Sequence, residues 1–125
     1  MSESNAAVLQ RLFEAFNRHD IDGVLDCMTE DCVFFPAAGP EAFGTRLEGH
    51  DALRQAFTGV WGGIPDVQWE NCSHYADGDL GLSQWTFTGT NANGGRIEVN
   101  GCDIFSFRDG KVASKNAFRK DRVAA

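Results

Sequence analysis

One carboxylate interrupts an otherwise apolar pattern in the segment from Arg96 to Arg108, whose residues alternate as in a β-strand. One alternating set of side chains is apolar except for its single acid and consists of Ile97, Val99, Gly101, Asp103, Phe105 and Phe107. Alternate residues of a strand share one face of the sheet, so this set predicts the core-facing side. Burying an ionised carboxylate is costly unless a cation or hydrogen-bond donors accompany it. Asp103 is therefore a candidate functional acid, and a salt-bridged structural carboxylate is the alternative.

The partner of Asp103 is expected on the next strand, residues 112–120, and depends on the turn at Asp109-Gly110. A two-residue turn places Asp103 opposite Asn116, whereas a three-residue turn with a glycine bulge places it opposite Lys115. The first turn directs the even-numbered residues of this strand inward. The second directs the odd-numbered residues inward, which include Lys115 and Arg119. The residues alone leave this register open.

Three helices are predicted ahead of these strands. Residues 5–18 carry apolar side chains at three- and four-residue steps, which is typical of an amphipathic helix. Asp20 is suited to cap a second, short helix that carries Val24, Leu25 and Met28 inward. A third helix is expected over residues 50–61, ending at Gly62-Gly63. A short strand at 32–35 and a loop at 37–48 separate the second helix from the third.

Everything after Pro65 is predicted to be strand and turn. Strands are expected over 67–75, 80–90, 96–108 and 112–120, with turn-forming residues at 76–79, 91–95 and 109–110. Helices followed by hairpins indicate the α+β class. We therefore expect a single domain over residues 1–125, with three N-terminal helices packed on a strongly curved, mostly antiparallel sheet.

Composition narrows the classes of function. The 125 residues are 42% hydrophobic and 23% charged and carry a formal net charge of −7, which is typical of a globular domain and argues against a nucleic-acid surface. No apolar run approaches the roughly 20 residues of a membrane span, and the N-terminus resembles no secretory signal, so a cytoplasmic location is expected. The four cysteines form no C-x-x-C pair and lack histidines at zinc-site spacing, so we predict neither metal nor cofactor.

Four short motifs follow one another along the chain. They are FNRHDIDGV at 16–24, TEDCV at 29–33, LEGHDAL at 47–53 and DIFSFRDGKV at 103–112. In order and spacing they resemble the nuclear transport factor 2-like superfamily, in particular its SnoaL-like polyketide cyclase and ketosteroid isomerase branch, over about residues 5–120. The resemblance implies a cone with a pocket between helices and sheet, and a homodimer formed through the outer face of the sheet.

The same resemblance assigns candidate roles to individual residues. Asp103 matches the acid that stays protonated in ketosteroid isomerases and donates to the substrate oxyanion. The general base of those isomerases falls near Phe35 here and their tyrosine near Leu12, so steroid-type isomerisation is not expected. The last strand of the family lines the pocket at positions matched by Lys115 and Arg119, which favours the three-residue turn.

Two functions are compatible with these residues. The first is an isomerase, cyclase or hydrolase type of enzyme that acts on a small apolar carbonyl or polycyclic metabolite, with Asp103 as catalytic acid. The second is a binding or sensing module with the same pocket and no chemistry. In either case the expected ligand-binding residues are Lys115, Asn116, Arg119, Trp85, Phe16, Phe35 and Phe57. A homodimer is expected because the outer sheet face should carry tryptophan and phenylalanine side chains.

Overall fold

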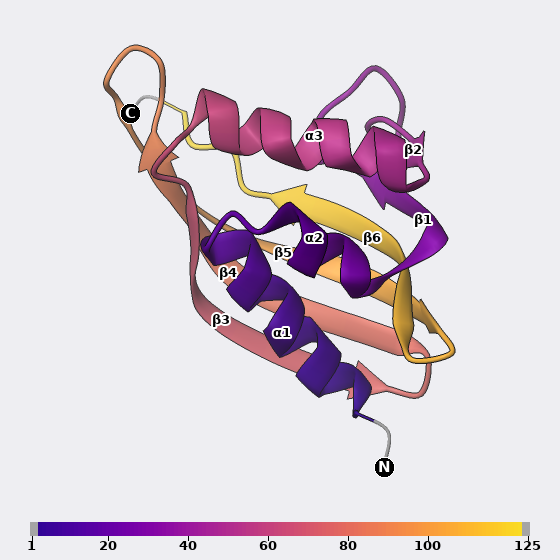
Figure 1. Ribbon diagram of the computed structural model, residues 1–125. Coiled ribbons are helices and arrows are strands. Elements are labelled where there is room, and N and C mark those ends of the chain that lie inside the picture. Colours follow the sequence, from indigo (N-terminus) through magenta and orange to yellow (C-terminus); the bar gives the residue numbers. More distant parts are fainter. Residues whose placement is uncertain (1–2, 124–125) are drawn as a thin grey trace.

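Three helices pack on the inner face of a curled six-stranded sheet in the computed structural model, which describes residues 3–123 (Figure 1). Neighbouring strands follow the order β2-β1-β6-β5-β4-β3; β1 and β6 are parallel and the other neighbours are antiparallel. The predicted α+β class is confirmed. The elements are α1 (Asn5–Asn17), α2 (Ile21–Asp26), β1 (Met28–Phe35), β2 (Leu47–Glu48), α3 (His50–Gly63), β3 (Gln68–Asp77), β4 (Leu80–Thr90), β5 (Arg96–Arg108) and β6 (Lys111–Arg119).

The first two helices begin where capping side chains allow it. The hydroxyl of Ser4 accepts a hydrogen bond from the Ala7 backbone N–H at the start of α1. Asp20 does the same for α2 by accepting from the Gly23 N–H at 3.0 Å, as predicted. Between them His19 adopts a left-handed backbone with φ of 56°, which ends α1 and redirects the chain. The apolar side of α1 is buried against β3 and β4.

Several element boundaries differ from the prediction. The second helix ends at Asp26, and Met28 instead opens β1, which is longer than the predicted strand at 32–35. The parallel pairing explains this length, because β6 contacts both ends of β1 through Met28 with Val112 and Phe35 with Asn116. The predicted loop at 37–48 contains the short strand β2. Helix α3 continues through Gly62 and Gly63, two residues beyond its predicted end.

The β5–β6 hairpin adopts neither of the two predicted registers. Its turn has two residues, because Arg108 pairs with Lys111. A bulge then follows between Val112 and Ser114, so that Asp103 lies opposite Ala117 rather than Asn116 or Lys115. The extra residue allows both Val112 and Lys115 to face inward and be buried. The sequence pattern missed this because a bulge changes which residues face the core midway along the strand.

The outer face of the sheet carries fewer aromatic residues than expected. The tryptophans Trp61, Trp69 and Trp85 are all buried on the helix side, so the prediction that tryptophans lie outside is wrong. Exposed apolar side chains on the outer face include Ile104 and Phe118, which are 41% and 48% exposed. Within residues 3–123, no helix is both long and apolar enough to cross a membrane.

Candidate functional site

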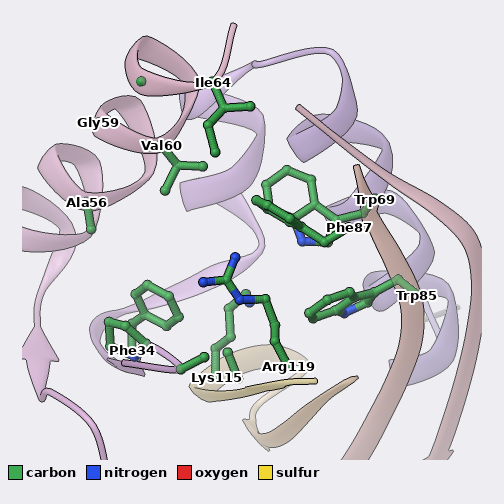
Figure 2. A pocket seen from close by; sticks show the side chains of 14 residues that line it. Phe34, Ala56, Gly59, Val60, Ile64, Trp69, Trp85, Phe87, Lys115 and Arg119 are labelled. Atoms are coloured by element: carbon green, nitrogen blue, oxygen red, sulfur yellow. The ribbon is translucent and has the colours of Figure 1, made fainter. Parts of the chain in front are cut away.

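An apolar pocket of about 400 Å³ lies between α3, the end of β1 and the inner face of the sheet (Figure 2). Helix α3 forms one wall and the strands β3, β4 and β6 form the opposite wall. Its lining is Phe34, Pro36, Ala37, Ala56, Gly59, Val60, Gly63, Ile64, Trp69, Trp85, Phe87, Lys115, Ala117 and Arg119. Lys115 and Arg119 are the ionisable side chains among these described residues, so the pocket combines an apolar body with two cations.

Small side chains on α3 create the volume of the pocket. The four helix residues that line it are Ala56, Gly59, Val60 and Gly63, which recur at steps of three and four and therefore share one helix face. A Cβ atom built at Gly59 meets nothing within 4 Å, which shows that this face borders open space. Glycine lowers the stability of a helix, so Gly59 keeps the cavity open at a cost to the stability of α3.

Gly101 shapes the sheet side of the pocket because it has no Cβ atom. It lies on β5 between its Cα partners Trp85 on β4 and Arg119 on β6. A Cβ atom at Gly101 would lie 2.5 Å from Cζ3 of Trp85 and 2.4 Å from the carbonyl oxygen of Phe118. The missing side chain allows the Trp85 indole to lie across the strand. Trp85 and Arg119 thus flank the pocket from either side of this glycine.

Asp103 is fully buried and holds two donors of the pocket wall. Its Oδ1 accepts from Lys115 Nζ at 2.7 Å, and its Oδ2 accepts from Trp85 Nε1 at 2.9 Å. The expected contact between Asp103 and Lys115 is present, although it crosses the strands diagonally. Asp103 itself does not line the pocket, because Lys115 and Trp85 lie between its carboxylate and the cavity. The carboxylate therefore acts on the pocket through Lys115 and Trp85.

Lys115 presents a buried ammonium group at the base of the pocket. The residue is only 4% exposed, and its Nζ lies 5.5, 5.0 and 6.0 Å from the ring centres of Phe16, Phe34 and Phe105. An ammonium group retains N–H donors beyond the one given to a single carboxylate oxygen. In a site of low polarity such a donor strongly stabilises a negatively charged oxygen. Lys115 can therefore hold an oxyanion at this position.

Arg119 differs from Lys115 in having no acidic partner. Its guanidinium carbon lies 4.8 Å from the ring centre of Phe87, a cation–π contact. Among residues 3–123, no carboxylate lies within 4 Å of it. In Figure 2 its side chain extends from β6 toward α3. The positive charge of Arg119 is thus free to meet a ligand.

The structure brings together only part of the predicted ligand-binding set. Lys115, Arg119 and Trp85 line the pocket. Phe16 and Phe57 do not line it. They contact each other edge to face at 5.0 Å and pack against the lining residues Trp69 and Phe34, respectively. Phe35 and Asn116 are Cα partners outside the pocket lining. Their adjacent residues Phe34 and Lys115 point into the pocket, as alternation along both strands requires.

Sequence reasoning missed the α3 face and the aromatic residues Phe34, Trp69 and Phe87. Small residues at helical spacing on an otherwise amphipathic helix were an available signal, because a core-facing helix usually presents larger side chains. Phe34 could not be separated from Phe35 without the β1 register. Trp69 and Phe87 are Cα partners, so only the β3–β4 register places them together.

A second polar contact lies beside Asp103 on the inner face. His74 on β3 and Ser83 on β4 are Cα partners, and Ser83 is in turn the partner of Asp103 on β5. His74 Nδ1 and Ser83 Oγ are 2.8 Å apart. Burial against Phe13 lowers the pKa of His74 below its usual range by desolvating the charged imidazolium. This contact satisfies the buried Ser83 hydroxyl and is separate from the pocket.

The thiols and acidic groups show no arrangement suited to a metal. Burial raises the pKa of Cys32 to about 12, so its thiolate, the metal-binding form, is disfavoured. Over residues 3–123, no group of three His, Cys, Asp or Glu side chains gathers where it could hold a metal ion.

Comparisons with known proteins agree with this architecture. A search of curated proteins returns no significant match. A candidate polyketide cyclase from Xanthomonas campestris superposes with a TM-score of 0.81 at 23% identity, over 92% of each chain. A nuclear transport factor 2-like protein of unknown function from Burkholderia pseudomallei gives a TM-score of 0.80 at 20% identity, over 94% of this chain and 92% of the other. TerC, co-crystallised with polyporic acid, gives a TM-score of 0.79 at 19% identity, over 93% and 91%.

These structural likenesses lie below 25% identity and establish the fold. The family itself is shown by a sequence model, which matches residues 9–115 and therefore covers most of the chain, including α2, α3 and the Asp103–Lys115 pair. The protein belongs to the SnoaL-like domain family.

Proposed function

We propose that this protein binds a small aromatic or polycyclic carbonyl compound and promotes its enolisation. The observation that carries the proposal is the buried ammonium of Lys115, held by Asp103 at the base of an apolar pocket. A flat apolar ligand fits between α3 and the aromatic side chains of Trp69, Trp85 and Phe87. The similarity of the fold to a candidate polyketide cyclase supports the same class of ligand.

The proposed step is loss of a proton from the carbon next to the carbonyl group. The electron pair of that C–H bond moves into the carbonyl, and negative charge develops on its oxygen. Lys115 donates a hydrogen bond to this oxygen and stabilises the charge. Asp103 keeps Lys115 in position and accepts from Trp85 at the same time. Among the described lining residues there is no carboxylate or imidazole, so the proton passes to water at the pocket mouth.

A binding or sensing module is the second candidate. The same lining is compatible with it, because a pocket without an internal base can also bind an enolate or phenolate that is already formed. The two candidates differ in one observable, which is exchange of the ligand's carbon-bound hydrogens.

The test uses 2-acetylnaphthalene, an aromatic methyl ketone. Binding is measured by fluorescence, and exchange of its methyl hydrogens in D₂O is measured by NMR. The proposal predicts saturable binding and faster exchange with the wild-type protein, and loss of the acceleration in Lys115→Met. Binding without acceleration favours the sensing module, and no binding contradicts both candidates.

Gly59→Leu and Gly62→Leu form a matched pair for this test. Both positions lie on α3 and leave open space for a Cβ atom, but only Gly59 lines the pocket. Gly59→Leu should therefore abolish binding by filling the cavity, whereas Gly62→Leu should leave it unchanged. Both variants should have a free energy of unfolding at least as high as that of the wild type, because leucine favours the helix by roughly 0.8 kcal/mol over glycine. Equal loss of binding in both would show that the ligand lies elsewhere.

We also propose that the protein forms a homodimer through the outer face of the sheet. Ile104 and Phe118 support this, since both are exposed on that face. Light scattering of the wild type should give twice the monomer mass, and Phe118→Asp should give the monomer mass. A monomeric wild type at micromolar concentration contradicts the proposal.

A further inference from the structure

A second, polar groove adjoins the apolar pocket. It encloses about 630 Å³ between the ends of β5 and β6 and the segment after β6. Ile64, Phe87 and Arg119 line both the pocket and this groove, so the two spaces meet at these three side chains. A ligand longer than the pocket therefore has a continuous path past Arg119.

The groove is positively charged in an otherwise acidic protein. It is lined by four cationic side chains and two carboxylates, namely Arg96, Arg119, Lys120 and Arg122 with Glu98 and Asp121. The whole chain carries a formal net charge of −7, so this concentration of cations is local. A concave surface with an excess of one charge raises the local concentration of an oppositely charged ligand.

The arginines of the groove are also the ones that lack acidic partners. Within residues 3–123, five arginines form salt bridges to carboxylates, and these are Arg11, Arg18, Arg46, Arg54 and Arg108. The remaining three, Arg96, Arg119 and Arg122, have no carboxylate within 4 Å and all line the groove. Arg122 donates instead to the backbone carbonyl of Glu98 at 3.3 Å. Their guanidinium donors are thus available to an anion from outside.

We propose that the natural ligand is an aromatic carboxylic acid whose ring system fills the pocket and whose ionised carboxylate binds at Arg119, in the groove. This inference rests on the proposed function, since the ring system is placed in the same pocket. Arg119 is the anchor because it borders both spaces and its planar fork can donate two parallel hydrogen bonds to a carboxylate. Arg96 and Arg122 add long-range attraction along the groove.

The test compares two fluorescent probes that share a ring and a chain, 4-(1-pyrenyl)butyric acid and 4-(1-pyrenyl)butanol. The wild type should bind the acid about tenfold more tightly than the alcohol, as expected for one charge-assisted contact. Arg119→Gln should lower affinity for the acid about tenfold more than it lowers affinity for the alcohol. Arg96→Gln and Arg122→Gln should each weaken only the acid, about threefold.

Lys111→Gln is the charge-matched control. Lys111 lies at the opposite end of β6 from Arg119 and outside both the pocket and the groove. Equal losses in Lys111→Gln and Arg119→Gln would show diffuse attraction and overturn the inference. Equal wild-type affinities for acid and alcohol would also overturn it, while leaving pocket binding intact. Failure of the wild type to bind either probe would overturn pocket binding and this inference together.

Discussion

Replacing either member of the Asp103–Lys115 pair should destabilise the protein strongly. Asp103 is 0% exposed and Lys115 is 4% exposed, so water cannot solvate the charge that remains when either partner is removed. Removing one partner of a buried ion pair typically costs about 3–5 kcal/mol, because an uncompensated charge stays behind. Asp103→Asn also removes a hydrogen-bond acceptor, since one amide oxygen cannot replace both the Oδ1 contact to Lys115 and the Oδ2 contact to Trp85.

A double variant separates the free energy of the Asp103–Lys115 interaction from the contacts that each residue makes with other residues. Lys115→Met together with Asp103→Asn leaves no buried charge, so it should cost about the same as either single change rather than their sum. The resulting coupling free energy is about 3–5 kcal/mol. For a chain of this length each single change should lower Tm by about 10–20 °C. Urea unfolding followed by tryptophan fluorescence measures all four proteins.

An exposed pair of similar geometry provides the control cycle. Arg46 and Glu48 are 2.9 Å apart, but both side chains are about half exposed. Their coupling should stay below about 1 kcal/mol. If the Asp103–Lys115 cycle gives a value as small as this control, the buried charge pair is not what holds the pocket base, and the argument for Lys115 as a positioned cation is wrong.

Three further outcomes follow from the structure. Burial lowers the pKa of His74, so at pH values below about 6.5 the unfolded chain binds a proton that the folded chain does not. The free energy of unfolding should therefore rise as pH increases toward 6.5. His74→Gln should flatten this rise, as urea unfolding across pH 5–8 can measure. Gly101→Ala should cost about 1–3 kcal/mol and weaken 2-acetylnaphthalene binding, because its Cβ would displace Trp85; unchanged binding by fluorescence titration would contradict this. Cys32, with a pKa of about 12 and no exposed surface, should react with iodoacetamide only upon unfolding, as mass spectrometry of pulse-labelled protein can show.

The sequence identified Asp103 as an unusual buried acid, but it did not predict correctly which residues lie opposite Asp103. Asp103 stands out because its type conflicts with the alternation of β5, and this conflict is visible without any partner strand. Its contact with Lys115 was expected from a three-residue turn that does not exist. The contact forms because the bulge after Val112 changes the inward-facing set to Lys115 and Arg119. A local insertion of this kind leaves little trace in hydrophobic alternation.

The pocket could not be predicted in the same way. Its α3 wall and its β4 and β6 walls are distant in sequence and meet only through the curl of the sheet (Figure 1). A cavity is a lack of side-chain volume, so its signals are small residues such as Gly59 and Gly101. Glycine is also common in turns and at helix ends. The sequence pattern of Gly62 and Gly63 accordingly indicates a helix end, although α3 continues through both residues. Small residues become informative only after their neighbours are known.

The two cations of the pocket have different electrostatic surroundings, and this difference implies an orientation for the ligand. Asp103 balances Lys115, so the pocket base is close to neutral and suits a carbonyl oxygen that gains charge only during reaction. Arg119 is unbalanced at the rim and suits a group that is charged before it binds. A ligand with both groups would place its permanent anion outward, where desolvation costs least, and its reacting carbonyl inward, where a donor is already in position.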